Sequence, residues 1–589
     1  MGFPILGEAP DPLSGPVMPV HNSDIADIFN EVADLLEIEN ANPFRVRAYR
    51  NAARMMSSQS KSVAEMVNQG EDLTKLPGIG KDLAEKVKEI VQTGTLSQLK
   101  EIEGRTPGEL TRLMKVAGLG PKRVRLLYEK LGVSSLAQLK EAAYEGKISQ
   151  LKGFGKKTEQ QILEEMGREK KEKRFKLAVA EEVAEDIIKY LEKVKGVQEV
   201  IVAGSFRRRK ETVADLDILV TCQKGCGVME HFISYEDVRK VIAKGETRST
   251  VLLRSDLQVD LRMVPEASYG AALHYFTGSK AHNIAIRTMG VKRRLKINEY
   301  GVFKGSRRVA GRTEEEVYKQ VDLPFIEPEL RENWGEIEAA QEGELPKSIM
   351  LKDLRGDLHV HTKETDGRNT LEEMVEASLN LGYEYVAITN HSRHVSVARG
   401  LDVKGMTTLI RKIDRLREKT KGITILKSGE VDILENGSLD LPDGILKELD
   451  LTVCAVHFKF NLSREKQTER IVRAMDNPYF NILAHPSGRL INERESYEVD
   501  MEKLMKAALE RNCHLELNAH PDRLDLTDIY CKMAKEMGLK VAISTDAHSI
   551  GDLQFMRFGV GQARRGWLES EDVLNAGGLK DLFKRLKKR

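Results

Sequence analysis

The spacing of apolar residues divides the chain into a helical part and two parts that contain strands. From His21 to about Met166 apolar residues recur at helical spacing, as in SDIADIFNEVADLLEI, where Ser23 can cap the helix. From about Val197 short runs rich in β-branched residues, such as VQEVIVAGS, DLDILVT and LQVDLRMV, indicate strands joined by helices up to Leu323. The pattern predicts an all-helical region followed by an α+β region.

After Leu351 strand-like and helix-like patterns alternate to the end of the chain. The runs DLHVH, YVAIT, ITILKSGE, LTVCAV, NILA, LELN and VAIST are typical of buried strands. Such alternation favours a parallel α/β barrel or sheet. Residues 324–350 are rich in Pro and Glu with little periodicity and are predicted to be a linker, and residues 1–20 a flexible extension.

One short signature recurs three times in the helical part: LPGIGKDLAEKV, VAGLGPKRVRLL and LKGFGKKTEQQIL. Glycines in such a turn let the backbone approach another molecule, and amides at a helix N-terminus can hold a phosphate. One copy would indicate a helix cap, whereas three copies followed by basic residues resemble helix-hairpin-helix motifs, which hold DNA backbones without reading sequence. The resemblance implies DNA contacts, with Na⁺ or K⁺ ions, at Gly78, Gly80, Gly118, Gly120, Gly153 and Gly155.

Three acidic residues from two predicted strands form a candidate metal site. Asp215 and Asp217 lie two residues apart, so a strand directs both carboxylates to one face, and Asp260 adds a third from a neighbouring strand. Clustered carboxylates need cations to stay ionised together. Two Mg²⁺ ions, or Mn²⁺, would also activate a 3′-hydroxyl and stabilise a leaving pyrophosphate. A surface turn beside an acidic strand is the alternative, and the ordered appearance of Gly204-Ser205 before the aspartates disfavours it.

These segments resemble the catalytic palm of family X DNA polymerases of the DNA polymerase beta type. HYFTGSKAHNIAIR resembles the nucleotide-binding segment of that family, and INEYGVF resembles its thumb. The resemblance makes Asp215, Asp217 and Asp260 the catalytic metal ligands. It implies nucleotide contacts by Gly204, Ser205, Arg208, Tyr275, Phe276, Gly278, Asn283 and Arg287. One departure is Gln258, where the animal repair member of the family has Arg, so positioning of the primer end is expected to differ.

The helical part also carries a candidate lyase site. Lys86 lies where the lyase domain of the family has the lysine that forms a Schiff base with the sugar of an abasic site. Arg45 and Tyr49 match its DNA-binding 5′-phosphate pocket, whereas Asp82 replaces a further lysine. The alternative, that Lys86 is one of several solvated lysines such as Lys88, stays open.

The strands after Leu351 end in candidate metal ligands. His359 and His361 share one face of a strand and can clasp one metal ion. Later strands end in further histidines and acids at their C-terminal ends, where barrels build their active sites. The candidates are His359, His361, Asp366, His391, Glu430, His457, His485, Asp546 and His548. A histidine at a strand end is usually structural, but six with three acids are hard to explain that way.

The set resembles the polymerase and histidinol phosphatase (PHP) domain, a distorted (β/α)7, TIM-like barrel with a trinuclear metal site. The resemblance assigns His359, His361, Glu430 and Asp546 to one metal, Glu430, His457 and His485 to a second, and Asp366, His391 and His548 to the third. It implies metal-assisted hydrolysis of phosphate esters, and mixed His and carboxylate ligands suit Mn²⁺, Zn²⁺ or Fe²⁺. Two departures are Asn390 for an Asp, with altered tuning of the third metal expected, and His520 for an Asn.

Composition sets limits rather than a function. The net charge of +2 gives no global case for nucleic-acid binding. Five cysteines are scattered, and Cys222 and Cys226 lack the partners of a zinc knuckle, so we expect reduced thiols in a cytoplasmic protein. No run approaches the ~20 apolar residues of a membrane span, so no membrane association is expected.

Together these features predict a multidomain, monomeric DNA repair enzyme acting on gapped or nicked DNA with dNTPs. The expected activities are short-gap filling as in base excision repair, 3′-5′ exonuclease with AP endonuclease or 3′-end cleaning by the PHP domain, and 5′-dRP lyase. The alternatives are a PHP domain that is a small-molecule phosphatase or purely structural. The expected domains are lyase-like 21–100, fingers 101–170, nucleotidyltransferase palm 171–265, thumb 266–323 and PHP 351–589.

Overall fold

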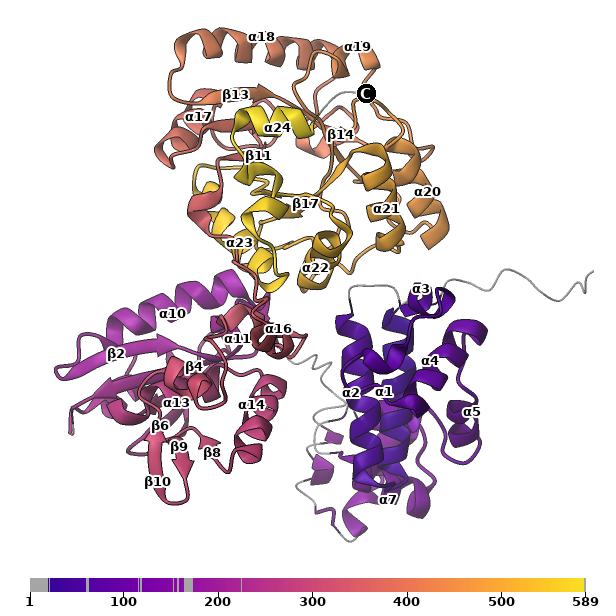
Figure 1. The fold of residues 1–589 in the computed structure, drawn as a ribbon, viewed down its shortest axis with the longest axis vertical. Coiled ribbons are helices and arrows are strands. Elements are labelled where there is room, and N and C mark those ends of the chain that lie inside the picture. Colours follow the sequence, from indigo (N-terminus) through magenta and orange to yellow (C-terminus); the bar gives the residue numbers. More distant parts are fainter. Residues whose placement is uncertain are drawn as a thin grey trace, which may run out of the picture. The chain divides into compact units, whose positions relative to one another are not determined.

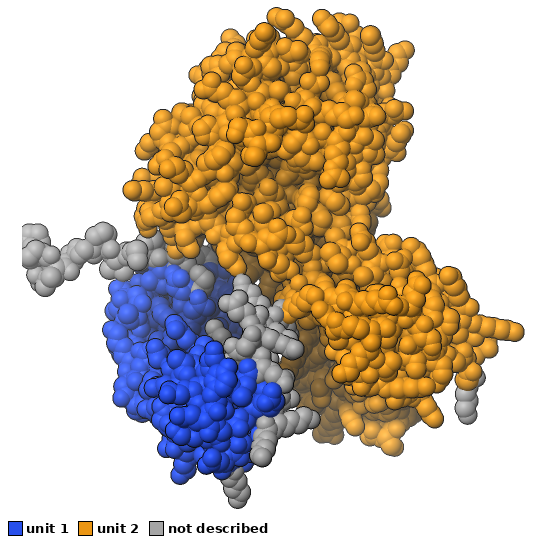
Figure 2. All heavy atoms as spheres, turned by 180° about the vertical axis from the view of Figure 1, so that it is seen from behind, with its two compact units in different colours: residues 1–172 blue, residues 173–589 orange. Residues whose placement is uncertain are grey.

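The chain falls into two compact units, Met1–Glu172 and Lys173–Arg589, shown in blue and orange in Figure 2. The computed structural model describes residues 20, 22–59, 63–114, 116, 119–151, 153–155, 158–160, 162–163, 173–223 and 225–586. The predicted extension therefore lies almost wholly outside the described residues.

The first unit is helical, as the apolar spacing predicts. Its helices are α1 (Asn22–Ile38), α2 (Pro43–Ser58), α3 (Val63–Asn68), α4 (Lys81–Thr93), α5 (Ser97–Glu103), α6 (Leu110–Leu113), α7 (Pro121–Leu131) and α8 (Leu136–Tyr144), with 3-10 turns η1 (Leu73–Lys75) and η2 (Ile148–Gln150). Pro43 starts α2, and the Asn42 side chain accepts a hydrogen bond from the Phe44 amide. α1 and α2 lie side by side (Figure 1) and bury Ile25, Phe29 and Tyr49 in one core.

The palm is a five-stranded sheet in the order β2-β4-β7-β6-β5. Its strands are β2 (Val197–Val202), β4 (Asp215–Cys222), β5 (Val238–Ala243), β6 (Arg248–Leu253) and β7 (Gln258–Met263). Two short strands, β1 (Phe175–Lys176) and β3 (Thr212–Val213), form a separate two-stranded sheet. Alternation along β4 divides its faces. Leu216 and Ile218 pack under α10 (Leu177–Leu191), and Leu219 packs with α13 (Tyr269–Thr277). Asp215 and Asp217 therefore point to the α13 face.

The thumb contains α14 (Lys280–Lys292), β8 (Lys296–Asn298), β9 (Gly301–Lys304), β10 (Arg307–Ala310) and α15 (Glu314–Lys319). The segment predicted as a linker, 324–350, is part of the same core. It forms η4 (Pro328–Leu330) and α16 (Glu336–Glu342), and buries Leu330 and Ile337 beside Ile286 and Val317. These elements are too short to show periodicity, which is why the sequence pattern failed here.

The C-terminal domain is built from two parallel sheets. The strands are β11 (Gly356–Val360), β12 (Tyr385–Ile388) and β13 (Thr424–Lys427) in the first, and β14 (Glu430–Asp432), β15 (Val453–Ala455), β16 (Ile482–Leu483), β17 (His514–Asn518) and β18 (Val541–Ser544) in the second. Isolated bridges join Val360 to Ala547 and His391 to Glu430, and so link the two sheets. We call this region the α/β domain.

Helices flank the two sheets in the chain order that the sequence predicts. They include α17 (Leu371–Asn380), α18 (Val403–Lys419), α20 (Arg464–Ala474), α21 (Met501–Arg511), α22 (Asp528–Met537), α23 (Met556–Arg565) and α24 (Leu579–Arg585). One large apolar core lies between strands and helices. A second, smaller core joins Leu358, Leu426 and Ile482 of the strands to Leu582 of α24.

The structure corrects the expectation for the cysteines. Cys222, at the end of β4, and Cys226 form a disulfide, with their Cα atoms 6.4 Å apart, within the span that a disulfide bridges. Cys454, Cys513 and Cys531 are free and buried. In the described part of the chain, no helix combines the length and the apolar character that crossing a membrane requires.

Candidate active sites

The three predicted palm aspartates lie close together on two adjacent inner strands of the sheet. β4 and β7 pair in parallel, with Asp217 opposite Asp260 and Asp215 opposite Gln258. Burial and the neighbouring Asp215 and Asp260 raise the pKa of Asp217 to about 6. A carboxylate crowded in this way gains most from divalent cations, which neutralise the cluster. Gly204, with φ +64°, allows this packing, because a Cβ there would lie 2.9 Å from Asp217 Oδ2.

Asp260 is fixed by three donors. Thr250 Oγ1 donates at 2.6 Å, Gln258 Nε2 at 2.8 Å and Arg248 Nη2 at 3.0 Å. Burial alone would raise the pKa of Asp260, but these donors lower it. Gln258, the departure from the family pattern, thus serves as a donor to the third aspartate.

The run of three arginines after Ser205 is fully paired with glutamates. Each of Arg207–Arg209 has a different partner at 2.7–3.0 Å, which are Glu314, Glu332 and Glu181 in chain order. The sequence predicted a nucleotide contact for Arg208. It did not reveal the glutamate partners of the three arginines, because these partners are 28 to 124 residues away. Arg208 also donates to the Thr277 carbonyl, which lies beside Gly278.

The predicted nucleotide-binding residues lie around the turn between α13 and α14. The rings of Tyr275 and Phe276 meet edge to face at 5.1 Å, and Asn283 Nδ2 donates to the Tyr275 carbonyl at 2.7 Å. Gly278 has φ +70°, and a Cβ there would lie 3.1 Å from Arg208 Nη1. Arg287 is exposed on α14. The structure therefore brings Arg208 to this turn, while contacts with a nucleotide stay predictions.

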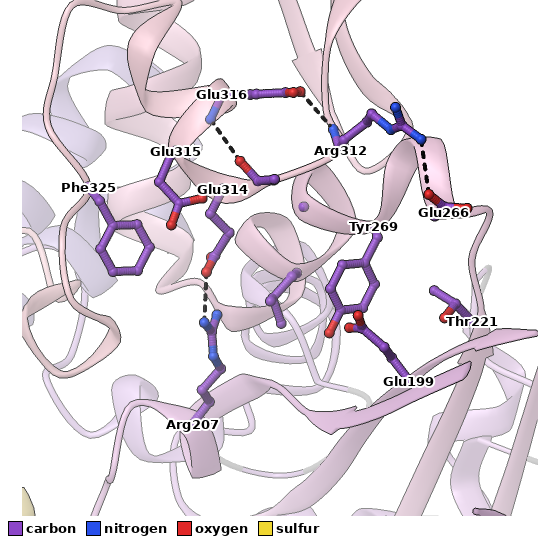
Figure 3. A pocket seen from close by; sticks show the side chains of 13 residues that line it. Glu199, Arg207, Thr221, Glu266, Tyr269, Arg312, Glu314, Glu315, Glu316 and Phe325 are labelled. Atoms are coloured by element: carbon purple, nitrogen blue, oxygen red, sulfur yellow. Dashed lines mark hydrogen bonds and ion pairs between the residues drawn. The ribbon is translucent and has the colours of Figure 1, made fainter. Parts of the chain in front are cut away.

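A separate pocket of about 620 Å³ lies at the junction of palm and thumb, with Glu199, Arg207 and Tyr269 among its lining residues. Figure 3 shows Arg207 pointing to Glu314, and Tyr269 lying beside Glu199. Its acidic side chains are Glu199, Glu266, Glu314, Glu315 and Glu316, against the basic Arg207 and Arg312. The excess of negative charge disfavours phosphate binding in this pocket.

The repeated glycine turns open helices, as predicted. Gly80 caps α4 and Gly120 caps α7, while Gly78 and Gly153 have φ of +79° and +96°, which favours glycine. Gly155 is described but Gly118 lies outside the described residues.

The candidate lyase residues occupy α2 and α4. Lys86 forms an ion pair with Asp82 one turn earlier, and its side chain is 16% exposed. Tyr49 is buried and donates to Gln98 Oε1 at 2.5 Å, whereas Arg45 is exposed on the same helix. The Asp82 carboxylate therefore offsets the positive charge of Lys86, through a contact that the sequence spacing alone did not establish.

The nine predicted ligands of the α/β domain come together at the strand ends. Three groups offer ligand atoms within 4.8 Å of one another: His359, His361 and Asp546; His391, Glu430 and His457; and His361, Asp366, His391 and His548. Glu430 is central, because its carboxylate oxygens lie 2.7–3.6 Å from nitrogens of His359, His361, His391, His457 and His485. His391 thus reaches both Glu430 and Asp366, which the family pattern placed with different metals.

The donor atoms of this cluster fit metal ions. His359 Nε2, both ring nitrogens of His361 and Glu430 Oε2 are buried without a hydrogen-bond partner. Leaving such atoms unsatisfied is costly, and cations among them would satisfy all. Burial opposes charging of His391 and His457, yet Glu430 and other carboxylates raise their pKa values to about 10 and about 9. Burial and the neighbouring His548 and His391 lower the pKa of His361 to about 3.

Several side chains missed in the sequence orient the candidate ligands. His359 Nδ1 lies 2.7 Å from Glu516 Oε1, and His457 Nδ1 lies 3.0 Å from Asp432 Oδ1. Such partners fix the tautomer and the direction of a ligating imidazole. The available signal was an acid inside an otherwise apolar strand, in LELN and EVDIL.

The hydrogen bonds described for the Asn390 side chain go to a turn rather than to an imidazole. Asn390 Oδ1 accepts from the Thr362 amide at 2.8 Å and from Thr365 Oγ1 at 3.0 Å, and its Nδ2 donates to Thr362 Oγ1. These bonds fix the turn that connects His361 to Asp366. An amide suits this place because it both donates and accepts.

Family models match three parts of the chain. A helix-hairpin-helix domain matches residues 20–96, a SAM-like helix-hairpin-helix tandem matches 110–168, and a DNA polymerase beta thumb matches 272–332. These matches indicate helix-hairpin-helix regions in the helical unit and a thumb of the DNA polymerase beta type after the palm sheet.

Similarity to known proteins covers almost the whole chain. The chain is 38% identical over 574 residues to the DNA polymerase/3′-5′ exonuclease PolX of Bacillus subtilis (strain 168), a match that covers 97% of this chain and 100% of that protein. It is also 30% identical over 246 residues to a probable phosphatase of Thermoanaerobacter sp. (strain X514), covering 40% of this chain and 96% of that protein. The chain therefore belongs to the PolX group of family X DNA polymerases, and the phosphatase-like relatives support a PHP domain at its C-terminus.

Proposed function

We propose that this chain fills short gaps in DNA by templated synthesis at the palm and removes 3′-terminal nucleotides at the α/β domain. The observation that carries the proposal is the pairing of Asp217 with Asp260 across β4 and β7, beside Asp215, in a chain that matches a polymerase with exonuclease over its whole length. Gapped or nicked DNA and dNTPs are the proposed substrates, in the cytoplasm.

The palm residues have distinct proposed roles. Asp215, Asp217 and Asp260 would hold two Mg²⁺ ions, or Mn²⁺, which when bound activate the 3′-hydroxyl and stabilise the leaving pyrophosphate. Gly204 keeps the strand end close to Asp217. Ser205 and Arg208 orient the triphosphate, and the Tyr275–Gly278 turn with Asn283 and Arg287 receives the sugar and base.

The α/β domain would hold its ions through the nine clustered residues. Mixed imidazole and carboxylate donors favour Mn²⁺, Zn²⁺ or Fe²⁺, which when bound supply Lewis-acid assistance to phosphodiester hydrolysis. Glu430 neutralises the histidines around it, and Glu516 keeps His359 directed at the centre. The buried donors exclude bulk water from all but the open side near His548 and Asp366, which are about one-third exposed.

The helical unit would grip the DNA backbone. Amides at the N-termini of α4 and α7, after Gly80 and Gly120, offer phosphate donors without base contacts. Such a grip suits gapped DNA of any sequence.

Paired variants test the two assignments in one assay. Asp215→Ala with Asp217→Ala should abolish extension on one-nucleotide-gapped DNA and leave 3′-end removal intact. His359→Ala with His361→Ala should do the reverse. Loss of both activities from either variant, with unchanged melting temperature, would mean that the sites are not independent. Release of phosphate from histidinol phosphate at a rate above 3′-end removal would favour a small-molecule phosphatase instead.

Lyase activity is a second candidate, favoured by the partly buried Lys86 on the α4 surface. Borohydride trapping on DNA with a 5′-deoxyribose phosphate should be lost in Lys86→Ala and kept in Lys88→Ala, which changes an exposed lysine of the same helix. Equal trapping by both variants would remove the lyase assignment.

A further inference from the structure

α23 of the α/β domain packs directly against the arginine segment of the palm. A Cβ at Gly561 would lie 3.2 Å from Arg209 Nε, so the missing side chain allows the helix to touch this segment. The Phe558 ring lies 5.6 Å from the Arg209 guanidinium. In Figure 1, α23 borders the palm near α11 (Gly204–Arg207) and α16. A helix of one domain is thus in contact with the nucleotide-binding segment of the other.

Arg565, the last residue of α23, completes this contact. Its side chain is 1% exposed. Nη1 donates to the Arg208 carbonyl at 2.9 Å and to Glu332 Oε1 at 3.0 Å, and Nη2 donates to Asp528 Oδ2 at 2.5 Å. The helix end is fixed, because a Cβ at Gly566 would lie 2.3 Å from a side chain of α22. Arg565 therefore has little freedom to move away.

Glu332 is shared between two guanidinium groups. The same oxygen that accepts from Arg565 accepts from Arg208 Nε at 3.0 Å, and the Glu332 side chain is 10% exposed. Lys210 is the next nearest cation, with its Nζ 3.9 Å from Glu332 Oε1. Without Arg565, the buried Glu332 carboxylate would have Arg208 as its main counter-charge. The ion pair between Glu332 and Arg208 would then become stronger, because an uncompensated buried charge is costly.

We propose that Arg565 is a positioning residue for nucleotide binding in the palm, acting through Glu332 and the Arg208 carbonyl. It shares the charge of Glu332 and so keeps the Arg208 side chain available to an incoming triphosphate. The inference rests on the proposed role of Arg208. It gives the α/β domain a part in synthesis that does not involve its metal ligands.

Steady-state filling of a one-nucleotide gap tests this role. Arg565→Met keeps the length of the side chain and removes its donors. We expect the KM for the matching dNTP to rise about tenfold, the cost of one charge-assisted hydrogen bond, with kcat changed far less. Arg565→Lys restores the charge and should recover part of the loss. The rate of 3′-end removal by the same preparations reports whether the α/β domain is intact.

Arg564→Met is the matched control. Arg564 is the preceding residue of the same helix and also crosses to the polymerase part, pairing with Glu329 at 2.8 Å, but no described contact joins it to Arg208 or Glu332. Its KM for dNTP should stay near the parental value. An equal rise in both variants would mean general docking of the domains and would overturn the proposal.

A double-variant cycle separates positioning from folding. If Arg565 acts through Arg208, then Arg208→Met with Arg565→Met should raise the KM no further than Arg208→Met alone. Additive effects would contradict the proposal, as would a parental KM in Arg565→Met. If Arg565→Met does not fold, Glu332→Gln removes the shared charge with little change in shape and must alter the KM for the proposal to stand. Absence of synthesis by the parental chain would instead overturn the proposed function.

Discussion

The two candidate metal sites of this chain are built in opposite ways. The palm site takes three carboxylates from two paired strands, and one register, Asp217 opposite Asp260, creates it. The site of the α/β domain takes nine residues between His359 and His548, with the Glu430 carboxylate at its centre. The first uses oxygen donors, and the second uses mainly imidazoles.

The difference teaches how each site handles its own charge. In the palm, three carboxylates lie close together, and burial together with this crowding raises the pKa of Asp217. Cations would neutralise the cluster. In the α/β domain, histidines and acids already neutralise one another, and a metal ion must displace protons from them. The palm should therefore respond mainly to cation supply, and the α/β domain to cation supply and pH together.

The largest expected effect is at Glu430. Glu430→Gln removes the charge that faces five imidazoles, so we expect 3′-end removal to fall about 10³-fold and the bound-metal content to drop. Synthesis should stay near the parental rate. Single-turnover assays of both activities and metal analysis check this.

Glu435→Gln, a change at an exposed acid nearby, is the control for Glu430→Gln. Nuclease activity that survives in Glu430→Gln would break the comparison, because the site would then not depend on one central carboxylate.

A smaller effect is expected at Glu516, which touches His359 rather than the centre. Glu516→Gln should reduce 3′-end removal about 10- to 100-fold, since the imidazole loses its orienting charge. Glu510→Gln, on the exposed side of α21, should not. The rates of 3′-end removal by the two variants are compared in the same assay. A change below about twofold in Glu516→Gln would mean that Glu516 has no orienting role.

The pH response sharpens the contrast in charge. With pKa values of about 10 and about 9, His391 and His457 are protonated in the metal-free site at neutral pH. Lowering the pH therefore weakens metal binding there, by about tenfold per unit for each proton displaced. In the palm, burial and the neighbouring aspartates raise the pKa of Asp217 only to about 6, so the metal affinity of this cluster should hold until the pH falls towards that value.

Mn²⁺ activation curves for the two activities, from about pH 9 to about pH 7, measure this. The curve for 3′-end removal should shift to higher Mn²⁺ as the pH falls, while the curve for synthesis stays in place. A parallel shift of both curves would show that metal binding at the two sites has the same dependence on pH.

The smallest expected effect is at Gln258. Gln258→Ala removes one of the donors that hold Asp260 and leaves those of Thr250 and Arg248. The kcat for gap filling should fall about two- to fivefold, with 3′-end removal unchanged as the internal control. A loss beyond about 100-fold would instead make Gln258 an essential support of the third aspartate.

The sequence by itself determined the candidate ligands and the order of the elements. Alternation in DLDILVT placed Asp215 and Asp217 on one face, and positions at or just after strand ends selected the nine candidate residues of the α/β domain. These are properties of local periodicity, which the backbone geometry of a strand converts directly into direction.

Only the tertiary structure decided what these residues touch. The glutamate partners of Arg207–Arg209, the support of His359 by Glu516, the role of Asn390 in a turn and the packing of 324–350 into the thumb all join positions far apart in sequence. Contacts of this kind depend on how elements pack and on which charges burial forces together, and no local pattern records either. The same holds for Arg565, whose place beside Arg208 exists only because two domains meet there.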